Sequence, residues 1–192
     1  MEIPRKQSVS LHACSDYMHI MAQEENAMRI LAYNRETAVA YARRWAYGRN
    51  PVYYNFDGIG GDCTNFASQC LFAGAAQMNF TPDIGWYYKN VNNRAAAWSG
   101  VEYFYNFLIR NAQTPIGNGQ GPIAQETDVA GLEIGDFVQF GNESGFYHTP
   151  VVVGFSGEVP LLAAHTNDTF NRPLTSWRFQ RLRCIHITGV RQ

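Results

Sequence analysis

The chain has 192 residues, 46% of them hydrophobic, and a formal net charge of -1, which is typical of a single globular domain with a substantial core. The near-neutral balance and the lack of a Lys/Arg run argue against nucleic-acid binding and against attraction to anionic membranes. No stretch approaches transmembrane length, so we expect no integral membrane association. Residues 1–30 contain no apolar signal-peptide segment, which leaves the cytoplasm or a non-classical or lysis-dependent export route open.

The first part of the chain predicts an N-terminal extension, residues 1–32, before a domain that spans residues 33–192. Residues 24–48 carry apolar side chains at helical spacing and predict one or two helices. Asn34 is placed to cap a helix, and Gly48 to end it.

The most informative segment is residues 60–70, which read GGDCTNFASQC. Gly60 and Gly61 permit a tight turn, and the apolar spacing that follows predicts a helix with Cys63 in its first turn. Unpaired N–H groups and the helix dipole at such an end favour a thiolate and can receive an oxyanion. The pattern therefore indicates a nucleophile at Cys63, whereas Cys70 is expected to be a buried hydrophobic residue.

Residues 75–131 are harder to interpret. Residues 101–110 predict a helix. Trp86 and the aromatic residues near it are candidates to line a substrate groove, although packing in the core or at its rim is the favoured explanation. Residues 115–122 are glycine-rich and lack the Lys-Ser/Thr ending of a phosphate loop, which predicts a mobile loop near the cleft.

Three strands are predicted near the C-terminal end, over residues 135–141, 147–154 and 160–165. As an antiparallel meander they would bring His148 and His165 together, with the cysteine helix packed on the sheet.

Cysteine hydrolysis needs such a set, because a base must take the thiol proton and a second polar group must orient the base. Cys63, His148 and His165 fit these roles in that order. The same three residues could form a Cys-His-His zinc site, but the thiolate explains the arrangement without a metal, and no Cys-x-x-Cys pair is present. We therefore expect no metal and no cofactor.

The ordered motifs resemble a known family. They are the segment GGDCTNFASQC, the preceding NPVY and YNRETAVAYA, then LEIGDFVQF, the histidine strand and AHTN. Together they resemble the bacterial putative amidase domain, related to the NlpC/P60 and CHAP papain-like cysteine hydrolases. The resemblance runs from about Tyr33 to the C-terminus. It implies an α+β papain-like fold with helices on an antiparallel sheet and the nucleophile at a helix N-terminus.

The resemblance also implies roles for individual residues. Cys63 would be the nucleophile, His148 the general base and His165 the residue that orients the base. Asn167 matches the position of a CHAP asparagine and is the alternative orienting residue or a fourth member of the set.

Two further positions follow from the same resemblance. Tyr53 lies near the place of an NlpC/P60 tyrosine beside the oxyanion hole. Asp62 matches the aspartate of the NlpC/P60 Asp-Cys motif, departs from the glutamine common in CHAP domains, and is a candidate contact for the oxyanion or the substrate.

The implied activity is hydrolysis of an amide through a Cys thioester, with a peptidoglycan amide or stem-peptide bond as substrate. An acyltransferase or transpeptidase on the same fold remains open, as does a catalytically silent module that binds glycan or protein. The sequence leaves the oligomeric state open.

Overall fold

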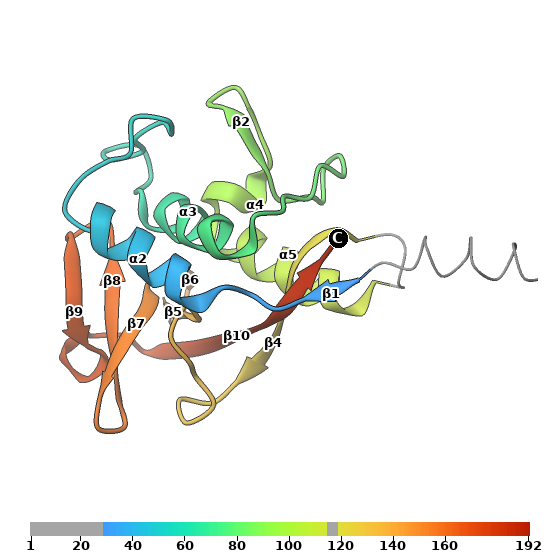
Figure 1. Cartoon of the computed structure of the whole chain (residues 1–192). Coiled ribbons are helices and arrows are strands. Elements are labelled where there is room, and N and C mark those ends of the chain that lie inside the picture. Colours follow the sequence, from blue (N-terminus) through green and yellow to red (C-terminus); the bar gives the residue numbers. More distant parts are fainter. Residues whose placement is uncertain (1–28, 115–118) are drawn as a thin grey trace, which may run out of the picture.

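The computed structural model describes residues 29–114 and 119–192. Helices cover one face of a curled antiparallel sheet (Figure 1). The helices are α2 (Arg35–Trp45), α3 (Cys63–Ala75), α4 (Ala96–Ser99), α5 (Val101–Gln113) and the 3-10 turn η1 (Leu174–Ser176). The strands of the large sheet are β1 (Ile30–Leu31), β4 (Gly121–Thr127), β5 (Phe137–Asn142), β6 (Gly145–His148), β7 (Val151–Ser156), β8 (Val159–Ala164), β9 (Thr169–Pro173) and β10 (Arg181–Arg191). A separate hairpin consists of β2 (Tyr88–Asn90) and β3 (Asn93–Arg94).

The large sheet has the strand order β1-β10-β5-β7-β8-β9, with β4 paired to β10 and β6 paired to β5. Its pairings are antiparallel. Along β5, Phe140 lies opposite His148 of β6, while Phe137 lies opposite Val151 of β7. The chain therefore leaves β6 at His148, passes Thr149 and Pro150, and pairs again with the same strand as β7.

Successive residues of a strand point to opposite faces of the sheet. In this sheet the residues on both faces are apolar. Phe137 and Val151 belong to the large core beneath the helices. Val138 and Val152, their sequence neighbours, belong to a smaller cluster on the other face. The sheet is thus covered on two sides, and the helical side contains most of the large buried aromatic residues.

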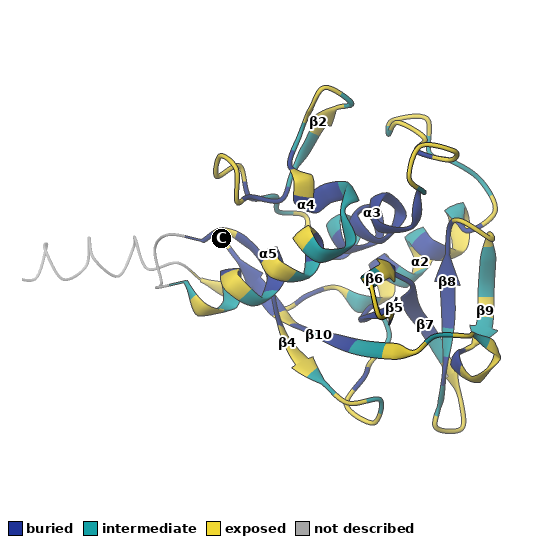
Figure 2. Cartoon of the chain, turned by 180° about the vertical axis from the view of Figure 1, so that it is seen from behind, coloured by how far each residue is buried: buried dark blue, intermediate teal, exposed yellow. Residues whose placement is uncertain are grey.

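Helix α3 lies at the centre of the molecule and is almost wholly buried (Figure 2). Gly74 allows Tyr33 to approach, since a Cβ added at this glycine would lie 2.4 Å from the Tyr33 ring. The helix ends at Ala76, which adopts a left-handed conformation with φ 53°. The buried helix therefore holds Cys63, its first residue, in a fixed place.

The structure confirms an α+β arrangement of helices on an antiparallel sheet. It also confirms the helix after Asn34, whose side chain accepts a hydrogen bond from the backbone N–H of Thr37. The three strands predicted near the C-terminal end correspond to β5, β7 and β8, although His148 closes β6 and does not open β7.

Two expectations were wrong in detail. Ile30–Leu31 pairs with β10 as a strand and is not helical, because the end of β10 offers it a partner. Gly121 and Pro122 belong to β4 and not to a loop near the cleft. Residues 115–118 of the glycine-rich segment and most of the proposed extension, residues 1–28, lie outside the described residues. None of the described helices is long and apolar enough to cross a membrane.

Candidate functional site

A cleft of about 400 Å³ lies where the loop before α3 meets the end of β6. The segments that follow β8 and β9 complete its walls. Of the residues predicted from the sequence, it brings together Cys63, His148 and Asn167.

The turn into α3 depends on its glycines. Gly60 and Gly61 have φ of +86° and +98°, a left-handed region that other residues rarely adopt. A Cβ at Gly61 would lie 3.2 Å from Thr166 Oγ1, and this same hydroxyl accepts a hydrogen bond of 3.1 Å from the backbone N–H of Asp62. The loop before Cys63 is thereby packed against the segment that follows β8.

Cys63 is 6% exposed. Its Sγ lies 3.8 Å from Thr64 Oγ1 and 4.0 Å from the backbone oxygen of Tyr147. Burial raises the pKa of the Cys63 thiol, and hydrogen bonds from the backbone of Thr149 and from Thr64 oppose this effect without overcoming it. Burial thus acts against the expectation that the helix end favours the thiolate.

His148 is 7% exposed and is enclosed by aromatic rings. Its ring centroid lies 5.9 Å from that of Phe140 and 5.4 Å from that of Trp177. Burial, assisted by the positive charge of Arg172, lowers the pKa of His148 to about 4. The imidazole is thus neutral at pH 7, and its Nε2 is buried without a hydrogen-bond partner among the described residues.

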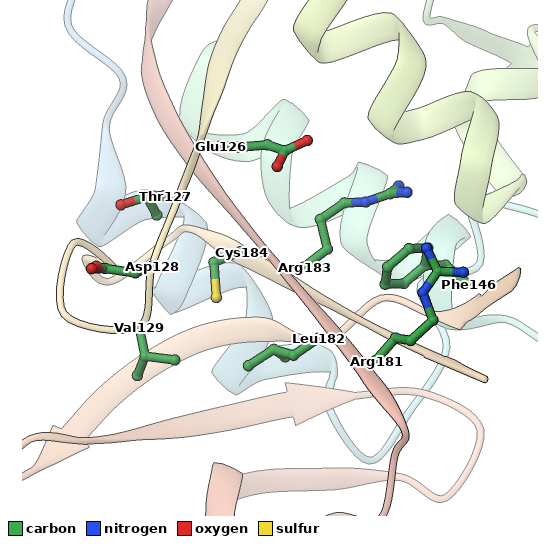
Figure 3. A pocket seen from close by; sticks show the side chains of 9 residues that line it. All are labelled: Glu126, Thr127, Asp128, Val129, Phe146, Arg181, Leu182, Arg183 and Cys184. Atoms are coloured by element: carbon green, nitrogen blue, oxygen red, sulfur yellow. The ribbon is translucent and has the colours of Figure 1, made fainter. Parts of the chain in front are cut away.

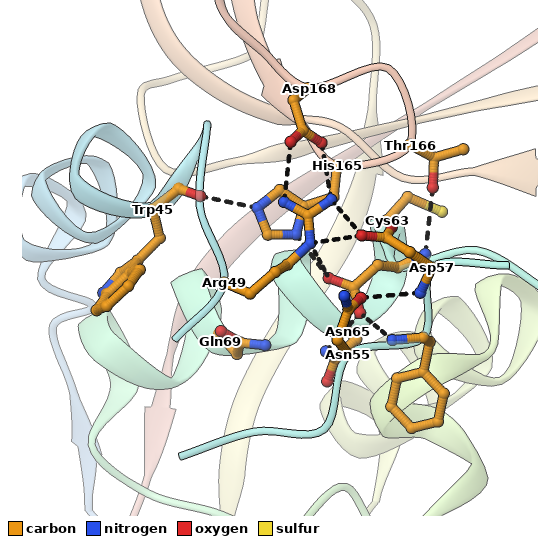
Figure 4. A network of polar contacts seen from close by, with 12 residues as sticks. Trp45, Arg49, Asn55, Asp57, Cys63, Asn65, Gln69, His165, Thr166 and Asp168 are labelled. Atoms are coloured by element: carbon orange, nitrogen blue, oxygen red, sulfur yellow. Dashed lines mark hydrogen bonds and ion pairs between the residues drawn. The ribbon is translucent and has the colours of Figure 1, made fainter. Parts of the chain in front are cut away.

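His165 occupies a different environment, shown in Figure 4. Its Nδ1 lies 2.6 Å from Asp62 Oδ2 and its Nε2 lies 2.8 Å from the backbone oxygen of Trp45. The ring also stacks on Phe66 at a centroid distance of 3.9 Å. Both nitrogens are therefore engaged away from His148, which corrects the expectation that His165 orients this base.

Asp62 is completely buried, so it serves the loop and does not face a substrate. Its Oδ1 accepts hydrogen bonds from the Phe56 backbone N–H at 2.9 Å and from Asn65 Nδ2 at 2.8 Å. It makes no side-chain capping bond to α3. The expectation that Asp62 contributes directly to substrate binding is thus wrong for this structure.

Arg49 extends this network. It lies 3.6 Å from Asp62 and forms a two-pronged pair with Asp168 at 2.9 and 3.0 Å. It also pairs with Asp57 at 2.8 Å. The network therefore connects the loop before Cys63 to the loop after β8 (Figure 4).

The remaining predicted residues lie in three different settings. Asn167 is exposed on the wall of the cleft, with φ 72°. Tyr53 packs on Trp98 at a ring distance of 5.6 Å and is not part of the cleft wall. Trp86 is 0% exposed and its Nε1 donates to Ser68 Oγ at 2.9 Å, so this side chain belongs to the core. The suggested contact of Trp86 with substrate is therefore corrected.

No cluster of three or more His, Cys, Asp and Glu side chains suited to a metal occurs within residues 29–114 and 119–192. The alternative zinc site of Cys63, His148 and His165 is not formed, because both nitrogens of His165 are engaged elsewhere.

The sequence did not single out Arg172, Trp177 and Arg178, which line the same cleft. They lie in β9 and just after it, where neither a glycine turn nor a histidine draws attention. The sequence indicated these residues only through an Arg and a Trp five residues apart. The contact between the two side chains depends on the turn η1, which lies between them.

A larger cavity of about 630 Å³ lies beside β4 and β10 (Figure 3). Its Arg183 is already held by Glu102 at 3.2 Å and by Gln139 at 2.9 Å. Burial raises the pKa of its cysteine, Cys184, to about 11. This cavity contains none of the predicted site residues, so the smaller cleft is the better candidate.

Comparisons with known proteins identify the family of this chain. Residues 32–187 match the family described as "Putative amidase domain". The chain is 33% identical over 159 residues to "Uncharacterized protein YhbB" of Bacillus subtilis (strain 168), a match that covers 80% of this chain and 48% of the relative. The chain thus spans about half the length of that relative. No solved structure matches the chain. Because the family match extends over most of the sequence, the chain belongs to the "Putative amidase domain" family.

Proposed function

We propose that this protein is a cysteine-dependent amide hydrolase with Cys63 as nucleophile and His148 as general base. The observation that carries the proposal is that one cleft, at the N-terminus of a buried helix, contains both a thiol and a neutral imidazole. Membership of an amidase family supports an amide as the substrate. The papain-like arrangement related to NlpC/P60 and CHAP enzymes is part of this proposal.

The resting pair suits a base-assisted attack. His148 takes the proton from Cys63 as the sulfur attacks the amide carbonyl, and then gives this proton to the leaving amine. The C–N bond breaks and a thioester remains, which a water molecule hydrolyses with His148 again as base. The neutral imidazole can accept the thiol proton at pH 7, whereas an imidazolium could not.

The start of α3 supplies the stabilisation of the oxyanion. The side chain of Asp62, the residue before α3, makes no capping hydrogen bond to the first N–H groups of this helix. The backbone N–H of Cys63 is the donor we propose for the tetrahedral intermediate, an interaction worth about 3 kcal/mol per donor in known enzymes.

Asn167 is the polar residue that we propose as a contact for His148 or for the substrate. It lines the cleft and is exposed, whereas His165 is engaged elsewhere. The proposed substrate remains a peptidoglycan amide or stem-peptide bond, on the strength of the sequence resemblance.

Incubation with digested peptidoglycan, followed by mass spectrometry of the fragments, tests this function. We expect one class of amide bond to be cut by the wild type and by Cys184→Ala, which changes a buried cysteine on the other face of the sheet. We expect Cys63→Ala to cut none. Full activity of Cys63→Ala would refute the role of the thiol, and a dominant new amide after adding glycinamide would establish acyl transfer in place of hydrolysis.

A further inference from the structure

The wall of the cleft beside Cys63 is positively charged. It contains two arginines, Arg172 and Arg178, and no aspartate or glutamate. Neither arginine pairs with a carboxylate among the described residues. The N-terminus of α3 adds partial positive charge to the same cleft. An uncharged substrate would leave this charge without a partner.

Arg172 is held in a fixed orientation. Its Nε donates to Ser176 Oγ at 3.0 Å and its Nη2 donates to the Ser176 backbone oxygen at 2.9 Å. Its guanidinium carbon lies 3.9 Å from the centre of the Trp177 ring. Two nitrogens and one face of the group are thus engaged, and Nη1 has no hydrogen bond among the described residues. A guanidinium fixed in this way loses little side-chain entropy when it binds a planar anion.

The position of Arg172 relative to His148 indicates which part of the substrate it meets. The Trp177 ring contacts both the guanidinium, at 3.9 Å, and the imidazole, at 5.4 Å. Arg172 therefore lies at the same end of the cleft as His148. In the proposed reaction, this is the end at which the leaving amine receives its proton.

We propose that Arg172, assisted by Arg178, binds a carboxylate that the substrate carries on the leaving-amine side of the amide to be cut. This inference rests on the proposed hydrolase function and specifies its substrate class: amides whose released amine bears a carboxylate, such as an amino acid or an acidic peptide.

The subsite also serves the proton transfer. The positive charge of Arg172 disfavours the imidazolium form of His148. A bound carboxylate offsets this charge just as His148 must hold the proton from Cys63 before passing it to the amine. The protonated form of His148 is therefore favoured only while the substrate is bound.

Steady-state kinetics on three matched peptides test the subsite. The first has a free carboxylate on the leaving side of the amide, the second has the same carboxylate amidated, and the third carries its carboxylate on the acyl side. We expect the first to exceed the other two in kcat/KM by about tenfold or more, the effect of losing a hydrogen bond to a charged group. Arg172→Gln should abolish this preference, so that kcat/KM becomes the same for the acid and the amidated peptide.

Two further variants serve as controls. Arg181→Gln removes the same charge in the separate cavity beside β10 and should keep the preference. Arg172→Lys should restore only part of it, since a lysine cannot reproduce the two bonds to Ser176. Thermal melting checks that each variant is folded.

Binding to the Cys63→Ala protein, measured by NMR, separates this inference from the hydrolase function. The product amine with a free carboxylate should bind more tightly than its amide, and Arg172→Gln should remove the difference. Equal binding of the two, or equal turnover of the three peptides, overturns the subsite and leaves the hydrolase intact. Absence of turnover with preferential binding of the acid overturns the hydrolase and leaves the anion site.

Discussion

His165 and Asp62 are joined by a 2.6 Å contact between Nδ1 and Oδ2, in a place where both side chains are 1% exposed. The second ring nitrogen of His165 faces another acceptor, the backbone oxygen of Trp45. A carboxylate and a carbonyl both accept hydrogen bonds, so each ring nitrogen of His165 faces an acceptor. The pair connects the end of β8 to the residue before Cys63, and its role is to hold this loop in place.

His165→Ala should lower the free energy of unfolding by about 3–5 kcal/mol, because it leaves Asp62 buried with one partner fewer. Urea denaturation at pH 7 measures this change. The matched variant is Asn167→Gly, which removes a side chain two residues away and tolerates the left-handed backbone at φ 72°.

Asn167→Gly should change stability by less than about 1 kcal/mol. If both variants proved equally stable while His165→Ala lost activity, His165 would act in the reaction itself and the proposed structural role would be wrong.

The alkylation rate of Cys63 should continue to rise at pH values above the ordinary pKa range of a thiol, because burial raises the pKa of Cys63. Iodoacetamide reacts with thiolates, so labelling at pH 6–7 should be slow in the absence of substrate. Mass spectrometry of the peptide that contains Cys63 gives the rate, with Cys63→Ala as the background. A fast, pH-independent rate at pH 6–7 would indicate a preformed thiolate and contradict a neutral resting pair.

His148 should make the protein less stable in acid. Its pKa is lowered from 6.5 to about 4 in the folded protein, so between these values the unfolded chain binds a proton that the folded chain does not. The free energy of unfolding is therefore not reduced by His148 above pH 6.5. It decreases as the pH falls toward 4, by roughly 3 kcal/mol in all.

Denaturation of the wild type and of His148→Gln from pH 7 to pH 4.5 isolates this effect from that of the carboxylates. The wild type should lose more stability than the variant over this range. Parallel losses in the two proteins would mean that His148 titrates normally.

Substitution of Trp86 should mainly lower the stability of the protein, whereas substitution of Trp177 should mainly lower its activity. Trp86→Ala should cost about 3–5 kcal/mol of stability, because it opens a cavity in the core and removes the partner of Ser68. Trp177→Ala should reduce kcat/KM more than it reduces stability, since its ring supports both His148 and Arg172. Parallel urea titrations and kinetic assays distinguish the two residues, and unchanged kinetics of Trp177→Ala would remove its ring from the proposed site.

The local sequence alone determined the helix that begins at Cys63, the cap at Asn34 and the strands around His148. These features depend on glycine turns, side-chain capping and apolar periodicity, which act over a few residues. Local sequence patterns are therefore sufficient to identify Cys63 and His148 as the candidate pair.

The tertiary structure alone decided the surroundings of that pair. His165 lies close to His148 along the predicted meander, yet it bonds to Asp62, 103 residues away in the sequence. Arg172 and Trp177 enter the cleft only because β9 and η1 return to it. The pKa of Cys63 shows the same dependence on the fold. Burial, which depends on the whole structure, raises the pKa of this thiol, whereas the sequence made visible only the opposing effect of the helix end.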